Sequence, residues 1–240
     1  MRAFGITDIG KLRESNQDCF ALSVEGAEPV WAVVCDGMGG ANGGYYASNT
    51  AVGVLSHGMD ISFENLKHKQ VENLLKDIVS SANEAVYKTS CEQSELSGMG
   101  TTLVSALILQ DEAFIAHVGD SRAYHICGKK ITQITTDHSV VQQLVELGQI
   151  TEEEAKVHPE KNMITRAVGV KQEVETDVSV VKLNKNSAIL LCTDGLSNLV
   201  DKSEMLEIVE NNLHEDAAEM LVSLALSRGG NDNITVVIIK

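Results

Sequence analysis

Short hydrophobic runs of strand length recur along the whole chain. The clearest of them occupy residues 3–8, 30–35, 102–109, 113–118, 187–192 and 233–239. Many are followed by Asp or Gly, as expected where a strand ends in a turn. We therefore predict β-strands at these positions.

Helical periodicity marks several stretches between these runs. Two helices are predicted over about 45–57 and 63–91, and two more over about 202–212 and 215–228. In the second helix, apolar residues at spacings of three and four form one stripe. Strands grouped in runs, with helices inserted singly or in pairs, indicate an α+β fold. Two mainly antiparallel sheets that pack together and are covered by helices fit this pattern.

The segment from about 139 to 166 differs from its surroundings. It begins with a short amphipathic helix that Gly148 breaks, and an acidic turn follows for which Thr151 is a suitable cap. An insertion of this kind is either a simple connection or a mobile element over a site. The residues alone leave both possibilities open.

Composition favours one compact domain over 1–240 and excludes several functions. The 240 residues contain two prolines and no linker, repeat or low-complexity run. A formal charge of −15 argues against binding nucleic acid or an anionic membrane surface, both of which need Lys and Arg. The five cysteines are widely spaced without a C-x-x-C pair, so neither a zinc ribbon nor a disulfide framework is indicated.

Targeting signals are also missing from the sequence. The N-terminus lacks the basic start and apolar stretch of a signal peptide, and no hydrophobic run approaches the length needed to span a bilayer. We therefore expect a cytoplasmic protein with no membrane insertion. No evident interface stripe is present, which favours a monomer.

Five aspartates stand at the ends of the predicted strands. Asp36, Asp120 and Asp194 each follow an apolar run, Asp232 immediately precedes the last one, and Asp18 lies just ahead of C-F-A-L-S-V. Any one of them is explained as a turn or cap residue. Five in this setting indicate carboxylates that converge on a rigid edge and hold cations.

The chemistry of such a cluster favours Mg²⁺ or Mn²⁺. These ions prefer oxygen ligands and keep some water. Clustered carboxylates without a cation repel one another, and some stay protonated. Gly37 follows Asp36 without a side chain, so its carbonyl can also approach an ion.

Here the chain resembles the type 2C family of metal-dependent protein serine/threonine phosphatases, in its bacterial branch. The resemblance runs from about residue 5 to 237 through an ordered set of motifs, which makes it highly specific. The motifs are R-E-S-N-Q-D (13–18), V-C-D-G-M-G-G (34–40), G-M-G-T-T (98–102), H-V-G-D-S-R-A-Y (117–124), T-D-H-S (136–139), T-R-A-V-G (165–169), C-T-D-G-L (192–196) and G-G-N-D-N-I-T (229–235).

The resemblance implies a β-sandwich of two antiparallel sheets flanked by helices on both sides, in α-β-β-α layers. It also makes 139–166 a flap beside the active site that is mobile and influences substrate choice. The implied substrates are proteins that carry phosphoserine or phosphothreonine. A bacterial serine/threonine kinase, whose phosphorylation the enzyme reverses, is the implied partner.

The resemblance further implies two to three Mn²⁺ or Mg²⁺ ions as cofactors. Asp36 would bridge two ions and Gly37 would add its carbonyl, while Asp194 and Asp232 would complete the pair. Asp18 would act through water or from the outer shell. Asp120, with Asp194, would hold the third ion. A water that bridges two ions would then attack phosphorus in line.

Arg13 is the expected phosphate ligand, because a guanidinium offers two donors to two phosphate oxygens. A surface ion pair with Glu14 or another acid is the simpler alternative. Arg122 is expected to be structural and to orient Asp120. Met38 stands where eukaryotic relatives carry a histidine, so the general acid is open; His117, His138 and His158 are alternatives, as is water.

Other functions were weighed against this one. The Cys-x5-Arg and D-x-D-x-[TV] signatures of other phosphatase classes are absent from the sequence. A catalytically silent pseudo-phosphatase would keep the fold but lose residues of the metal set, whereas a metal-binding sensor would bind metal tightly without turnover. All five aspartates and Arg13 are present, which favours the enzyme.

Overall fold

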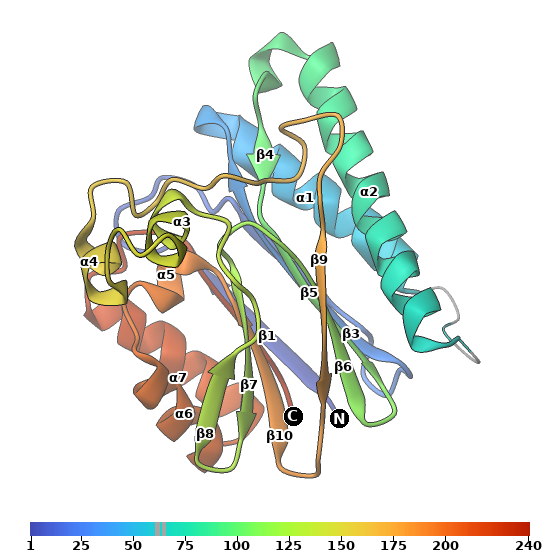
Figure 1. Cartoon of the computed structure of the whole chain (residues 1–240), viewed down its shortest axis with the longest axis vertical. Coiled ribbons are helices and arrows are strands. Elements are labelled where there is room, and N and C mark those ends of the chain that lie inside the picture. Colours follow the sequence, from blue (N-terminus) through green and yellow to red (C-terminus); the bar gives the residue numbers. More distant parts are fainter. Residues whose placement is uncertain (61–62, 64–65) are drawn as a thin grey trace.

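Two antiparallel β-sheets packed face to face form the centre of the computed structural model, which describes residues 1–60, 63 and 66–240 (Figure 1). The first sheet has the order β1 (Ala3–Asp8), β11 (Ile234–Ile239), β10 (Ser187–Cys192), β7 (Arg122–Cys127) and β8 (Lys130–Gln133). The second has the order β2 (Asp18–Leu22), β3 (Val30–Met38), β5 (Leu103–Leu109), β6 (Glu112–Val118) and β9 (Asp177–Lys182), and β4 (Gly100–Thr101) pairs with the end of β3. Each hydrophobic run predicted as a strand forms one.

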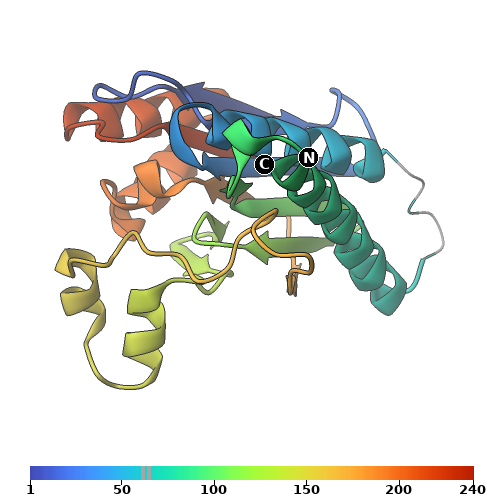
Figure 2. The same ribbon diagram turned by 90° about the horizontal axis from the view of Figure 1, so that it is seen from above.

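Helices cover both outer faces of this sandwich, as Figure 2 shows from above. The helices are α1 (Gly40–Met59), α2 (His68–Glu92), η1 (Ser94–Leu96), α3 (Val140–Glu146), α4 (Glu152–Val157), α5 (Asp194–Ser197), α6 (Lys202–Asn211) and α7 (His214–Ser227). The predicted helix over 63–91 is observed from His68 onward, and residues 64 and 65 of that prediction lie outside the described residues.

Three apolar layers hold the elements together. On β3, Trp31, Val33 and Cys35 face α1 and α2, whereas the alternate residues Ala32 and Val34 face the other sheet. This alternation follows from the two-residue period of a strand, and it shows that β3 is buried on both sides. A third layer packs β10 and β11 against α6 and α7. The predicted α+β sandwich with helices on both sides is confirmed.

The sheets also bring the chain ends together. β11 lies between β1 and β10, and the backbone of Arg2 exchanges hydrogen bonds with that of Lys240 at 2.8 and 3.0 Å. In the part of the chain that the structure describes, no helix combines the length and the apolar character that a bilayer crossing requires.

Candidate functional site

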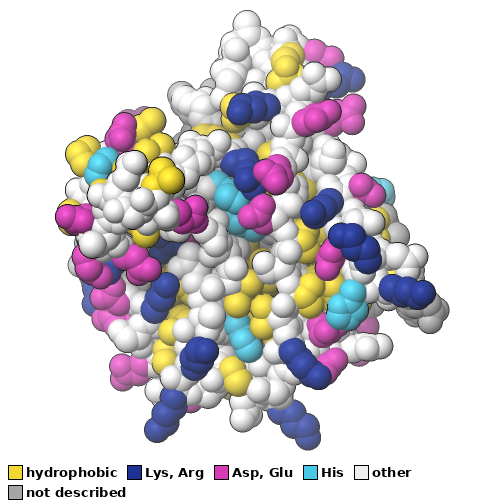
Figure 3. Space-filling model, viewed as in Figure 1, with side chains coloured by type: hydrophobic (Ala, Val, Ile, Leu, Met, Phe, Trp, Pro, Cys, Tyr) yellow, Lys and Arg dark blue, Asp and Glu magenta, His cyan; other side chains and the backbone are white. Residues whose placement is uncertain are grey.

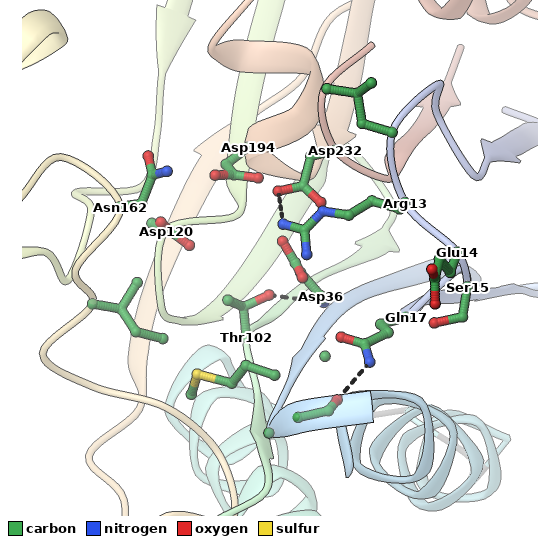
Figure 4. Close-up of a pocket in the computed structure, with 16 residues that line it drawn as sticks. Arg13, Glu14, Ser15, Gln17, Asp36, Thr102, Asp120, Asn162, Asp194 and Asp232 are labelled. Atoms are coloured by element: carbon green, nitrogen blue, oxygen red, sulfur yellow. Dashed lines mark hydrogen bonds and ion pairs between the residues drawn. The ribbon is translucent and has the colours of Figure 1, made fainter. Parts of the chain in front are cut away.

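A pocket of about 680 Å³ opens at one end of the sandwich, where the aspartate-bearing strand ends meet (Figure 4). Six of the seven residues predicted for the site line it: Arg13, Asp36, Gly37, Asp120, Asp194 and Asp232. The seventh, Asp18, stands directly opposite Asp36 in the β2–β3 pairing. The structure therefore brings together residues that are up to 219 positions apart in sequence.

Asp36 occupies the end of β3 and is fixed through its backbone. Its N–H donates to Thr102 Oγ1 at 2.9 Å, and its carbonyl accepts from the N–H of Thr102 at 2.8 Å. Burial raises the pKa of Asp36 well above its usual value, and the charges of Asp18 and Asp194 add to the effect. Asp36 is thus a partly buried carboxylate that needs a positive partner to stay ionised at neutral pH.

Gly37 is required by a close approach of two backbone segments. A Cβ built on it would lie 1.9 Å from the carbonyl oxygen of Gly44, in the first turns of α1. Any side chain would push the start of this helix away from β3. Helix α1 begins at Gly40, five residues before the predicted start; its first turns contain Gly43 and Gly44, and glycine is a poor helix former that weakens the helical pattern.

Asp18 lies behind Asp36 and is only 6% exposed. Its Oδ2 accepts hydrogen bonds from the hydroxyls of Thr193 at 2.9 Å and Thr235 at 2.7 Å, whereas its Oδ1 is buried and has no hydrogen-bond partner among the described residues. Burial raises the pKa of Asp18 to about 7, more than its two hydrogen bonds lower it. An unpaired buried acceptor of this kind marks a place where a cation or water belongs.

Asp194 and Asp232 lie next to each other in the lining of the pocket (Figure 4). Asp194 Oδ2 accepts from the side chain of Asn198 at 3.0 Å, and its Oδ1 is a second buried acceptor with no partner in the described part of the chain. Burial, followed by the charge of Asp232, raises the pKa of Asp194 to about 6. Asp232 accepts from Arg13 Nη2 at 2.6 Å and from the N–H of Asn233 at 2.8 Å.

Asp120 occupies the tight turn between β6 and β7. Burial raises the pKa of Asp120 to about 7, and the charges of Asp194 and Asp137 contribute. Arg122 is structural, as predicted, but its partner is different. Its guanidinium grips Asp137 through contacts of 2.6 to 3.1 Å, rather than orienting Asp120.

Arg13 reaches the pocket from the loop between β1 and β2. Its ion-pair partner is Asp232, not the neighbouring Glu14. The loop that carries Arg13 is fastened by Asn233, whose side chain accepts from the N–H of Gln17 at 2.8 Å. The Asn233 amide also donates to the carbonyls of Ile9 at 2.8 Å and Ser15 at 3.1 Å.

Sequence reasoning missed the residues that hold the carboxylates in place. These residues are not among the predicted metal or phosphate ligands, but their hydrogen bonds hold the aspartates and the Arg13 loop in position. They are Thr102, Thr193, Thr235 and Asn233. All four lie in or beside the motifs quoted for the site, and that proximity was the only signal available. The partners of a short polar side chain depend on which strands become neighbours.

The residues present fit a centre for small, hydrated divalent cations. Carboxylates with raised pKa values converge at one pocket, and two of their oxygen atoms are buried acceptors without a partner among the described residues. Among residues 1–60, 63 and 66–240, no group of three or more His, Cys, Asp or Glu side chains is placed to hold a metal ion by itself. Carboxylate oxygens are the donors that Mg²⁺ and Mn²⁺ prefer, and both ions complete their coordination with water.

The three histidines considered as general acids lie elsewhere. None of the described residues lining the pocket is a histidine, and Met38 occupies the lining position beside Gly37. His117 is buried on β6, where burial and the neighbouring His138 lower its pKa to about 3. His158 lies at the end of α4, away from the lining.

Comparisons with known proteins agree with this geometry. A family model described as protein phosphatase 2C matches residues 12–226. The serine/threonine phosphatase stp of Listeria monocytogenes serotype 4b is 37% identical over 235 residues, which cover 98% of this chain and 93% of that protein. The crystal structure of the serine/threonine phosphatase Stp1 from Staphylococcus aureus superimposes with a TM-score of 0.91 at 38% identity, covering 99% of this chain and 94% of that one. The catalytic domain of the phosphatase PstP, solved with two manganese ions, superimposes with a TM-score of 0.85 at 33% identity and covers 99% and 96% of the two chains.

Proposed function

Since the chain belongs to the protein phosphatase 2C family and is a metal-dependent serine/threonine phosphatase, we propose that the pocket at the end of the sandwich hydrolyses phosphoserine and phosphothreonine in proteins. The observation that carries the proposal is the convergence of five aspartates and Arg13 on that pocket. Divalent metal ions are its cofactors, and we propose two to three Mn²⁺ or Mg²⁺ ions.

Each carboxylate has a role that its position supports. Asp36, at the centre, would bridge two ions, with the Gly37 carbonyl beside it. Asp194 and Asp232 would complete this pair, and Asp120, with Asp194, would hold a third ion. When bound, the ions supply an acidic bridging water as the nucleophile and neutralise the phosphoryl oxygens. Asp18, buried behind Asp36, would act through a water.

Arg13 would bind the phosphate of the substrate. Its guanidinium forms an ion pair with Asp232 and supplies the positive charge beside that carboxylate. A cation at Asp232 would replace that contact, and the guanidinium fork would become available for two phosphate oxygens. We therefore assign Arg13 to the substrate and Asp232 to the metal in the working enzyme.

Proton delivery to the leaving alkoxide falls to water in this proposal. The described part of the pocket has no histidine in its lining, and Met38 cannot donate a proton. The enzyme needs no protein nucleophile, because a water activated by the metal ions would attack phosphorus. Of the protein's own residues, the attack on phosphorus and the protonation of the leaving alkoxide then require only the aspartates and Arg13 in their observed places.

The flap over residues 139–166 is proposed to meet the protein substrate. It contributes Asn162 and Ile164 to the pocket lining, and it carries α3 and α4 beside it. Figure 3 shows hydrophobic side chains gathered on this part of the surface, where Leu147 and Val157 are 72% and 81% exposed. Exposed apolar side chains next to a catalytic pocket are suited to contact residues on either side of a phosphorylated one.

The remaining assignments concern the setting of the enzyme. We propose that its substrates include a serine/threonine kinase and the proteins that this kinase phosphorylates. A single domain, a monomeric state and a cytoplasmic location stay predictions from the sequence.

The test is hydrolysis of a phosphothreonine peptide by the purified protein with Mn²⁺ and with EDTA. The variant Asp232→Ala should lower kcat by several orders of magnitude, because a metal-bound carboxylate supports several kcal/mol of transition-state stabilisation. Asp216→Ala, which removes an exposed carboxylate of α7 outside the pocket, is the matched control and should keep wild-type activity. A wild type that binds Mn²⁺ but releases no phosphate would refute the proposal and leave a metal-binding sensor or pseudo-phosphatase.

A further inference from the structure

His138 joins the two ends of the flap at its base. The carbonyl of His138 accepts from the N–H of Thr165 at 2.7 Å, and the neighbouring residues Ser139 and Ile164 form a β-bridge. The ring of His138 is buried against that of His117, with centroids 4.7 Å apart. The first and last residues of the flap therefore leave the sandwich from one fixed point.

The same ring is bonded on both of its nitrogens. Nδ1 accepts a hydrogen bond from the N–H of Gly119 at 3.0 Å, so Nδ1 carries no proton. In the neutral ring the proton is then on Nε2, which donates to Asp177 Oδ2 at 3.2 Å; Nη1 of Arg166 also lies 3.0 Å from Nε2. Arg166, at the far end of the flap, donates to the other oxygen of Asp177 at 2.8 Å. One imidazole thus connects a backbone amide on one side to a carboxylate on the other.

The two hydrogen bonds of the His138 ring hold two different parts of the proposed enzyme, the turn that carries Asp120 and the flap. The Nδ1 bond holds the turn that carries Asp120, since Gly119 is the residue before it and its N–H is the bonded group. This turn is also tied to Asp36, because Ser121 and Thr102 share a hydroxyl contact of 2.6 Å and Thr102 accepts from the N–H of Asp36. The Nε2 bond holds the flap, through Asp177 and Arg166.

Position 119 has no room for a residue larger than glycine, so no side chain at this position can hold the turn in place. Its φ of +110° lies in the left-handed region, and a Cβ on it would meet Thr102 at 2.7 Å. The turn has no side chain at this position and depends on backbone contacts. The carbonyl of Gly119 accepts from the N–H of His138 at 2.7 Å, so His138 binds both polar groups of Gly119.

We propose that His138 is a positioning residue that fixes Asp120 through Nδ1 and the flap through Nε2, and so sets the flap relative to the metal-holding carboxylates. The proposal rests on the proposed phosphatase function. His138 touches neither substrate nor ions in it; its effect is carried by Gly119 and by Asp177. Separate replacement of the two ring nitrogens should therefore give two different defects.

Two amides make this separation possible. In His138→Asn, the amide oxygen takes the place of Nδ1 and keeps the acceptor for Gly119, while the bond to Asp177 is lost. In His138→Gln, the amide nitrogen takes the place of Nε2 and keeps the donor to Asp177, while the acceptor for Gly119 is lost. His125→Gln, on β7, is the matched control, because the ring of His125 hydrogen-bonds with the hydroxyl of Ser187, away from the flap and the pocket.

The experiment measures hydrogen exchange without metal, together with kcat and KM for a phosphothreonine peptide with Mn²⁺. In His138→Gln we expect faster exchange at the Gly119 amide and a kcat about 10-fold lower, as for the loss of one buried hydrogen bond, with KM unchanged. In His138→Asn we expect faster exchange in the flap, at residues 140–146, and a KM several-fold higher with kcat retained.

The outcomes that overturn the proposal are equally defined. If both variants change kcat and KM in the same proportion, His138 contributes only general stability. If Gly119 exchanges no faster in His138→Gln than in the wild type, the Nδ1 bond does not hold the turn. An inactive wild type would refute the proposed function instead, and the exchange measurements would then decide on His138 alone.

Discussion

Replacement of Asp18 by asparagine should change the stability of the metal-free protein in opposite directions at low and at high pH. Asp18 is buried, its pKa is raised to about 7 from the usual 3.8, and its Oδ1 lacks a partner among the described residues. Asn has nearly the same shape and no charge. Its amide oxygen can still accept from Thr193 and Thr235, and its amide nitrogen takes the place of Oδ1.

The magnitude follows from two opposing effects. One pKa unit corresponds to about 1.4 kcal/mol, so holding Asp18 ionised in the folded protein above pH 8 costs on the order of 4 kcal/mol relative to the unfolded chain. Asn removes this cost but leaves a buried N–H group without an acceptor, which costs about 1–3 kcal/mol. At pH 8 the variant should therefore be more stable by about 1–3 kcal/mol.

The sign reverses at low pH. A group whose pKa is raised by folding contributes stability below its unfolded pKa and loses that stability as the pH rises through its folded pKa. For Asp18 this window runs from about 4 to about 7. Near pH 4.5 Asp18 is mostly a neutral acid in the folded protein, so its replacement by Asn removes little charge penalty. The cost of the unpaired N–H group of Asn then decides the difference in stability. The variant should then be less stable than the wild type.

Urea unfolding in EDTA at pH 4.5 and 8 measures both values. Saturating Mn²⁺ at pH 8 should abolish the advantage of Asp18→Asn, because cations at the neighbouring carboxylates favour ionised Asp18. A variant that is destabilised equally at both pH values would refute the reasoning, since Asp18 would then be well stabilised as a carboxylate without metal.

Three further predictions concern the same pocket. Arg13→Lys keeps the charge but loses the two-donor fork, and kcat/KM for a phosphopeptide should fall about 10- to 100-fold in steady-state kinetics; unchanged kinetics would contradict a phosphate-binding role. Gly37→Ala should lower the free energy of unfolding by about 1–3 kcal/mol in urea titrations, because its Cβ would overlap the carbonyl of Gly44, and native stability would show that α1 can move away. Mn²⁺ binding should strengthen from pH 5.5 to 7.5 and release protons below pH 7, because the pKa values of Asp18 and Asp120 are about 7. Calorimetry in two buffers of different ionisation enthalpy measures the protons released, and an affinity for Mn²⁺ that does not change with pH would contradict the prediction.

The sequence predicted the sandwich because its central strands are strongly apolar. Strand β3 is buried on both faces and reads as a continuous run, so its position and the aspartate after it were evident. Strand β9 was missed because it is an edge strand whose residues are mostly half-buried or exposed, which gives a weak pattern.

The candidate site was predicted as a set of residues but not as an arrangement. Strand ends indicated where Asp36 and Asp194 lie, and family motifs supplied Arg13. The pairing of Asp18 with Asp36, and the ion pair of Arg13 with Asp232, depend on sheet register and on contacts over long sequence distances. The link from His138 to Gly119 depends likewise on a backbone turn that composition does not specify.

The place of β11 in its sheet has a consequence for synthesis of the enzyme. This strand comes after β1 and β10 in the sequence, yet it lies between them in the sheet and brings Thr235 to Asp18. While a ribosome is still making residues before 232, the first sheet lacks an inner strand and the pocket lacks Asp232 and Asn233. Contacts of such sequence separation form late and slowly. Catalytic competence should therefore arise only after β11 has been made, so that a nascent or truncated chain that ends before Asp232 cannot remove phosphate.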